Sequence, residues 1–355
     1  MIDWDLAVTT GTRLVRPGPQ VSREDARQAV TELRTLSREA EGHVREFTKI
    51  HTEAPPQPAT IVDRPGWIKA NVEGFKVVLE PLTQRMGQNS PPPAIVTAVG
   101  SRITGVEVGA VLAFMASRVL GQYELFLPPD PSGAEPVGRL TLVAPNIVNA
   151  ERELGVDPHD FRLWVCLHEE THRVQFTGVP WLREYVRSQM TEFLLASDLD
   201  VSTLLERLRS AADTVADVVR GGEGNLIDVI QSPGQKEILD RLTAVMTLVE
   251  GHGDFVMDAV GPSVVPTVAD IRAKFGHRRE GGSRLDKTIR RLLGIDIKMK
   301  QYAEGSAFVR HVVGKVGMDG FNRVWTSPET LPTTPEITDP DLWIHRVIGE
   351  PALEA

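Results

Sequence analysis

One segment of the chain, residues 157–180 (DPHDFRLWVCLHEETHRVQFTGVP), carries both end signals of a single predicted helix. Asp157 is a favourable N-cap, and the proline after it suits the first helical position. Gly178 and Pro180 form a stop signal at the other end. We therefore predict a helix over residues 158–176, and any fold of this chain must accommodate the side chains that this helix presents.

The predicted helix contains the pattern H-E-x-x-H, formed by His168, Glu169 and His172. Its two histidines are four residues apart, so both imidazoles project from one face and can converge on one ion. Zn²⁺ suits neutral imidazole and accepts an open coordination position. Glu169 beside the pair can take a proton from a metal-bound water. The sequence thus predicts one Zn²⁺ per chain, with Glu169 as the general base.

Two histidines do not complete a zinc site, so a third protein ligand is expected elsewhere. The extended pattern H-E-x-x-H-x-x-G-x-x-H does not apply, because Gln175 stands at its glycine position and Gly178 at its last histidine position. A second helix, predicted over residues 233–260, offers other candidates.

In this second helix, Glu250 and Asp254 share one stripe with apolar side chains. Carboxylates on an apolar stripe are costly unless they are paired or bind metal. We predict Glu250 as the third ligand, with Asp254 accepting the outer N–H of a zinc-bound histidine. His252, on a different apolar face, is the rival ligand. An ion pair between Glu250 and an unrelated arginine is the alternative without a metal.

The rest of the chain predicts a mainly α protein with a small β-sheet or hairpin, an α+β fold. Two strand-like runs, residues 122–127 and 138–144, flank a loop rich in proline. The second run is the candidate edge strand that would hold an extended substrate by backbone pairing. A capped helix is predicted from Ser22 to about Thr48.

The helix with HEETH and the later EGHGD (250–254) resemble zincin-like metallopeptidases of the gluzincin type, which use H-E-x-x-H and a distant glutamate. The whole chain resembles, more closely, a mainly actinobacterial zincin-like family of hydrolases, one branch of which is linked by its name to coenzyme F420 biosynthesis. The stretches that carry this resemblance include WDLAVTTGTRLVRPGP (4–19), RVLGQYELFLP (118–128), LVAPNI (142–147) and KMKQYAEG (298–305).

This resemblance implies a mostly helical zincin fold and leaves the substrate unassigned. We expect residues 1–80 to form an N-terminal helical segment packed on the core, and residues 81–355 to form the zincin-like catalytic domain. In that domain, residues 325–340 are rich in proline and threonine, and we expect residues 325–355 to form an extended tail.

Acyl hydrolysis also needs a group that stabilises the developing oxyanion. Tyr302 in KMKQYAEG is the first candidate and His252 the second. The alternatives without a catalytic role are that Tyr302 packs at a helix edge and that His252 is a buried histidine hydrogen-bonded to the backbone. Glu170 is expected to be a solvated helix residue and not a second base.

Charge and composition exclude several classes of protein. Lys and Arg total 39 against 48 Asp and Glu, a net charge of −9, and an acidic surface repels phosphate backbones, so no nucleic-acid partner is expected. The most apolar stretch, residues 108–121, is too short to span a bilayer and contains Arg118. Cys166 is the single cysteine, and the N-terminus lacks the features of a secretory signal. We expect a cytoplasmic protein without a membrane partner.

Together these features predict a zinc-dependent hydrolase, most simply a metallopeptidase acting on a peptide or amide substrate. Two alternatives stay open: a zinc-binding scaffold or accessory protein with little hydrolytic activity, and a zinc hydrolase of a non-peptide amide metabolite. A protein partner is compatible with the sequence but is not specified by it.

Overall fold

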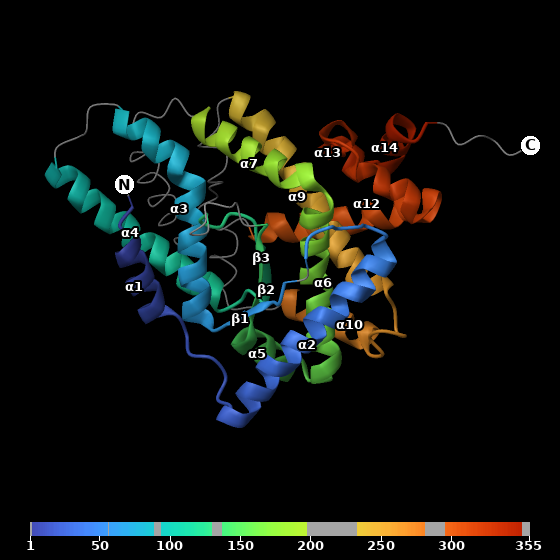
Figure 1. Cartoon of the computed structure of the whole chain (residues 1–355), viewed down its shortest axis with the longest axis horizontal. Helices are drawn as coiled ribbons and strands as arrows, with labels where there is room; N and C mark the ends of the chain where they lie inside the picture. Colours follow the sequence, from blue (N-terminus) through green and yellow to red (C-terminus); the bar gives the residue numbers. More distant parts are fainter. Residues whose placement is uncertain are drawn as a thin grey trace, which may run out of the picture. The chain divides into compact units, whose positions relative to one another are not determined.

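The computed structural model describes residues 2–55, 57–88, 94–129, 137–196, 233–280 and 295–349. They form helices and one small sheet (Figure 1), which confirms the predicted mainly α, α+β class. Contacts divide the chain into two compact units, Met1–Pro180 with Val256–Phe275 and Trp181–Phe255 with Gly276–Ala355. The predicted domain boundary at residue 80 falls inside a helix of the first unit and stays a prediction of the sequence.

The first unit contains the sheet and the helices that pack on it. Its elements are α1 (Trp4–Leu14), α2 (Arg23–Thr48), β1 (Thr60–Val62), α3 (Arg64–Gln88), α4 (Ala94–Ala116), β2 (Gly121–Glu124), β3 (Arg139–Val143), α5 (Ala144–Leu154), α6 (Pro158–Gly178), the end of α9 and most of α10 (Val268–Glu280). Ser22 caps α2 as predicted, because its side chain accepts a hydrogen bond from the Asp25 amide at 3.0 Å. Trp67, Ile68, Leu112 and Val143 lie in an apolar cluster of this unit.

The sheet has the order β1-β3-β2. β2 runs antiparallel to β3, as the predicted hairpin requires, and β1 runs parallel to β3 on its other side. The prediction of residues 138–144 as the edge strand was therefore wrong, because β3 is paired on both sides and β2 ends the sheet. β1 has only three residues within a proline-rich stretch, too few to show the alternation that identifies a strand.

The described residues of the second unit form helices joined by short connections. Its elements are α7 (Pro180–Leu195), α9 (Pro233–Ala259), α12 (Ile295–Phe321), the short 3₁₀ helices η1 (Asn322–Trp325) and η2 (Pro328–Thr330), α13 (Thr334–Thr338) and α14 (Pro340–Val347). α9 and α12 cross closely, since a Cβ on Gly251 would collide with the backbone of Gly305. Only glycine permits such a backbone contact.

The C-terminal region differs from the predicted extended tail. Residues 322–347 form four short helices, and Trp343 is fully buried among them. Pro328, Pro335 and Pro340 begin helices instead of breaking them, because each stands in a first turn, where a missing N–H costs nothing. Pro332 lies in the connection before α13.

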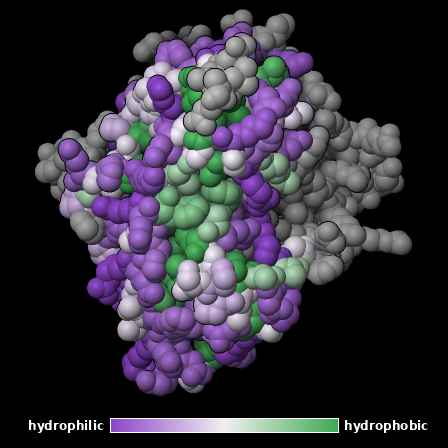
Figure 2. All heavy atoms as spheres, turned by 90° about the vertical axis from the view of Figure 1, so that its right-hand side faces the viewer, coloured by the Kyte–Doolittle hydropathy of each residue, from purple (hydrophilic) through white to green (hydrophobic). Residues whose placement is uncertain are grey.

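Hydrophilic side chains occupy most of the face shown in Figure 2, and hydrophobic ones form a band down its middle. Among the described helices, none combines the length and the apolar character that a membrane crossing would require.

Candidate metal centre

Helix α6 forms where the sequence predicts it. The Asp157 side chain accepts a hydrogen bond from the Asp160 amide at 3.0 Å, and Pro158 occupies the first turn. The helix continues to Gly178, two residues past the predicted end. A Cβ on Gly178 would collide with Ile50, so this position accepts only glycine without a shift of its neighbour.

The two histidines of α6 meet at their Nε2 atoms. These atoms of His168 and His172 lie 3.2 Å apart, with the ring planes nearly perpendicular at 86°. His172 is buried, and His168 is partly exposed. Two imidazole nitrogens that converge from one helix are what a pair of metal ligands requires.

The structure brings Glu250 of α9 into this group. The candidate ligand atoms of His168, His172 and Glu250 all lie within 4.8 Å of one another. Two imidazole nitrogens and one carboxylate oxygen are the three protein donors of many catalytic zinc sites, which keep a fourth position for water or substrate. The chemistry of this donor set therefore fits Zn²⁺. Among the residues that the structure describes, His252 is not part of the group.

Gln175 accompanies His172 on α6. Its Oε1 atom lies 3.0 Å from His172 Nδ1, and its side chain is buried. In the sequence, Gln175 served only to exclude a longer histidine pattern, and its contact with His172 was not predicted. Its spacing was the available signal, because a residue three positions after a ligand lies on the same helix face.

Glu169 is buried and lies against the first residue of β2. A Cβ added to Gly121 would stand 2.7 Å from the Glu169 Cδ and 2.9 Å from its Oε1. The carboxylate of Glu169 thus packs onto the backbone of the strand that ends the sheet, and only glycine leaves room for it. Sequence reasoning did not single out Gly121, since a glycine at the start of a strand has several uses.

Glu170 was expected to be solvated, and the structure corrects this. Its side chain is fully buried, accepts a hydrogen bond from Ser37 of α2 and pairs with Arg173 at 2.6 Å. Burial raises the pKa of Glu170 to about 8, against the opposing effects of Arg173 and Ser37. The prediction failed because α2 covers this face of α6, and a single polar residue does not reveal a covering helix.

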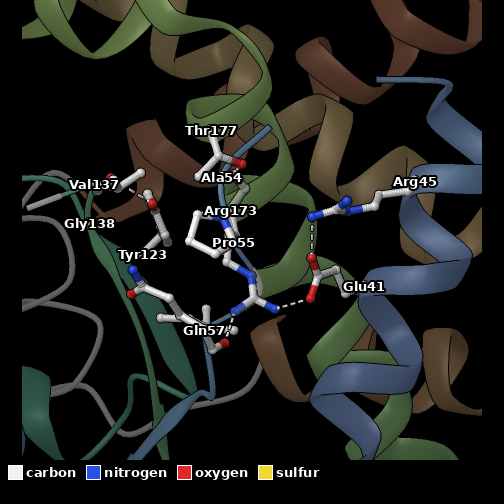
Figure 3. Close-up of a pocket in the computed structure, with 11 residues that line it drawn as sticks. Glu41, Arg45, Ala54, Pro55, Gln57, Tyr123, Val137, Gly138, Arg173 and Thr177 are labelled. Atoms are coloured by element: carbon white, nitrogen blue, oxygen red, sulfur yellow. Dashed lines mark hydrogen bonds and ion pairs between the residues drawn. The ribbon is translucent and has the colours of Figure 1, made fainter. Parts of the chain in front are cut away.

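A pocket opens beside Arg173 (Figure 3). Arg173 pairs with Glu41 of α2 at 2.8 Å and donates to the Gln57 carbonyl, while Arg45 pairs with the same Glu41 at 2.5 Å. The lining also includes Tyr123 of β2, and none of the predicted site residues belongs to it. We assign the Glu41, Arg45 and Arg173 cluster to the packing of α2 on α6, because each of these charges already has a partner there.

The remaining predicted site residues are distributed along α9 and α12. His252 is fully buried, with its ring 5.1 Å from Phe321 and 5.6 Å from Trp325 between centroids. Asp254 is buried in α9, as its apolar stripe predicted. Tyr302 belongs to the backbone of α12, but its side chain lies outside the described part of the chain.

Comparisons with known proteins place this geometry in context. The family described as zincin-like metallopeptidase matches residues 2–344. A crystal structure described as "a putative hydrolase with a novel fold", from Chloroflexus aurantiacus, is 29% identical, with a TM-score of 0.71 over 99% of this chain and 100% of that one. No curated protein matches the chain at a significant level. The narrower resemblance to an actinobacterial branch linked to coenzyme F420 stays a prediction of the sequence.

Proposed function

Since the chain belongs to the zincin-like metallopeptidase family, we propose that it is a zinc-dependent hydrolase that cleaves a peptide or amide bond. The convergence of His168, His172 and Glu250 within 4.8 Å is the observation that carries this proposal. We assign these three residues as the zinc ligands. A bound Zn²⁺ supplies Lewis-acid chemistry, which lowers the pKa of water and polarises a carbonyl.

Glu169 is the proposed general base. It neighbours His168 in sequence, is buried, and is held against Gly121. From this position its carboxylate accepts the proton of the attacking water and then delivers it to the leaving nitrogen.

The edge of β2 that faces away from β3 is the proposed binding edge for an extended substrate. β2 ends the described sheet, and its first residue, Gly121, touches the carboxylate of Glu169. An extended peptide that pairs with this edge by backbone hydrogen bonds would pass close to the general base. This assignment replaces the expectation for residues 138–144, which form the central strand.

Three further residues have roles proposed from the sequence. Asp254 orients a zinc-bound histidine through its outer N–H. Tyr302 of α12 stabilises the oxyanion. The close contact between Gly305 and Gly251 supports this role, because it brings the backbone of α12 to α9 at the residue that follows Glu250. His252 is the weaker candidate for the oxyanion role, because its ring is enclosed by Phe321 and Trp325.

The deciding experiment measures bound zinc and hydrolysis together. We expect one Zn²⁺ per wild-type chain, none in His172→Ala, and cleavage of a diverse peptide library by the wild type only. Glu169→Gln should keep its zinc and lose about 100-fold to 10,000-fold in rate, the usual contribution of a general base.

Other outcomes separate the alternatives. If the wild type and Glu169→Gln bind zinc equally and neither cleaves peptides or small amides, the protein is a zinc-binding scaffold. Turnover of small amides alone would move the substrate to a non-peptide metabolite. A wild-type protein without zinc would remove the proposal altogether.

A further inference from the structure

The contact between Gln175 and His172 has a chemical consequence for metal binding. His172 Nε2 faces His168 Nε2 at 3.2 Å, so Nε2 is the nitrogen that points toward the proposed ion. A neutral imidazole that donates its lone pair through Nε2 must carry its proton on Nδ1. The atom 3.0 Å from His172 Nδ1 is the side-chain oxygen of Gln175.

Gln175 is well suited to hold that proton in place. Its side chain has an exposed fraction of 0%, so neighbouring atoms fix its rotamer and exclude competing water. The amide oxygen can only accept a hydrogen bond, and the amide nitrogen can only donate one. An oxygen facing Nδ1 therefore selects the imidazole tautomer with a proton on Nδ1. Gln175 also has no charge, so it orients the ring without adding a second anion behind the ligand.

We propose, on the basis of the zinc site proposed above, that Gln175 is the positioning residue that fixes His172 in the Nδ1–H tautomer and orients its Nε2 toward the metal. Loss of such a partner behind a metal-bound histidine typically weakens metal affinity about 10-fold to 100-fold. Fixing the tautomer requires a hydrogen-bond acceptor at position 175, and glutamine is not the only residue that supplies one. A role in packing alone would instead depend on the size and shape of the side chain.

The test uses the full-length chain with two independent readouts. The first is the tautomer of His172 in the metal-free protein, taken from nitrogen–proton NMR correlations of the imidazole and assigned by comparison with His172→Ala. The second is Zn²⁺ affinity, measured by competition with a chromophoric chelator. The variants are Gln175→Leu, which removes the acceptor, and Gln175→Glu, which retains one. Gln189→Leu is the matched control, because Gln189 is a buried glutamine that accepts from Arg241 at 2.7 Å.

We expect the Nδ1–H tautomer in the wild type and a mixture of tautomers in Gln175→Leu. Zn²⁺ affinity should fall about 10-fold to 100-fold in Gln175→Leu, and should stay within about threefold of the wild type in Gln175→Glu and Gln189→Leu. If Gln175→Leu does not fold by circular dichroism, Gln175→Ala is the second acceptor-free variant, with the same expectations.

Two results would overturn the proposal. One is a wild-type His172 with its proton on Nε2, which needs no variant to detect. The other is a folded acceptor-free variant that keeps the wild-type tautomer and Zn²⁺ affinity. A wild type that binds zinc without hydrolysing anything would refute the proposed function and leave this inference standing. A wild type that binds no zinc would refute the proposed site, and the tautomer measurement would still decide the role of Gln175.

Discussion

Trp164 of α6 donates through its indole Nε1 to Asp258 of α9 at 3.3 Å, and Asp258 also pairs with Arg272 of α10 at 3.1 Å. α9 continues without a break from Pro233 to Ala259, so Glu250 lies about two turns before Asp258 in the same helix. His172 follows Trp164 at the same interval along α6. The Trp164–Asp258 contact therefore holds the end of α9 against α6. α9 carries the proposed carboxylate ligand, and α6 carries both histidines.

Asp258→Ala should weaken zinc binding although Asp258 is not a proposed ligand. The substitution removes the acceptor for Trp164 and the partner of Arg272, so we expect unfolding free energy to fall by about 1 kcal/mol and zinc affinity by about tenfold. Chelator competition and thermal unfolding measure the two effects. Asp270→Ala is the control, since Asp270 pairs with Lys274 within α10. Unchanged zinc affinity in a destabilised Asp258→Ala would show that this contact does not support the site.

Gly121→Ala should separate catalysis from metal binding. The new methyl group would stand 2.7 Å from the Glu169 Cδ and displace the carboxylate, while both histidines keep their contacts. We expect turnover to fall by about 100-fold, the lower estimate for loss of a general base, with one zinc still bound. Gly42→Ala of α2 is the control, because a Cβ there meets no atom within 4 Å. Turnover similar to that of the wild type would exclude Glu169 at this position as the base.

Helix limits and caps could be predicted because they are local. The Asp157 cap and the Pro158 start of α6 are set by neighbouring residues, so the predicted and observed helices begin at the same residue. α9 likewise ends at Ala259, one residue before the predicted end. The stripe that joined Glu250 to apolar neighbours is also local, and Glu250 belongs with the two histidines to a group that could hold a metal ion.

The burial of Glu170 and the strand order could not be predicted, because each depends on which distant segment packs against a given helix or strand. Glu170 was expected to be solvated because its hydrogen-bond donor, Ser37, lies 133 residues earlier in the chain, on α2. Its ion-pair partner Arg173 is shared with Glu41, which also lies on α2. Strand order depends likewise on pairing between distant segments, and β1 joins β3 across residues 60–143. A periodic pattern reports that a face is buried but not which element buries it.

Acid should destabilise the C-terminal helices through Glu336 of α13. Burial opposes ionisation of this carboxyl, but hydrogen bonds from Arg346 and Thr333 lower its pKa from 4.5 overall. A lowered folded-state pKa contributes stability above the unfolded pKa, and this stability is lost as pH falls through the folded value. Glu336→Gln should therefore be less stable than the wild type at pH 7, by about 1–3 kcal/mol.

The difference between the two proteins should begin to shrink below about pH 4.5, where the carboxyl of the unfolded chain takes up its proton. It should be small once pH has fallen below the lowered pKa of the folded chain, because both side chains are then neutral. Urea unfolding at several pH values measures it, and subtracting matched curves removes the effect of zinc loss common to both. Glu237→Gln, at an exposed position of α9, should differ from the wild type by less than about 0.5 kcal/mol throughout. A constant Glu336→Gln difference from pH 7 to pH 3 would contradict the assigned pKa direction.

Removing the metal should destabilise the wild type and leave His172→Ala unaffected. A ligand that binds only the folded chain adds stability of RT ln(1 + [L]/Kd), about 2.7 kcal/mol at a hundredfold excess over Kd. Three ligand atoms within 4.8 Å, two from α6 and one from α9, give the folded chain a site that the unfolded chain lacks. A chelator should therefore lower the wild-type Tm, and added Zn²⁺ should restore it. His172→Ala has one ligand fewer, so its Tm should respond to neither treatment. An equal response of both proteins would place the stabilising metal elsewhere on the chain.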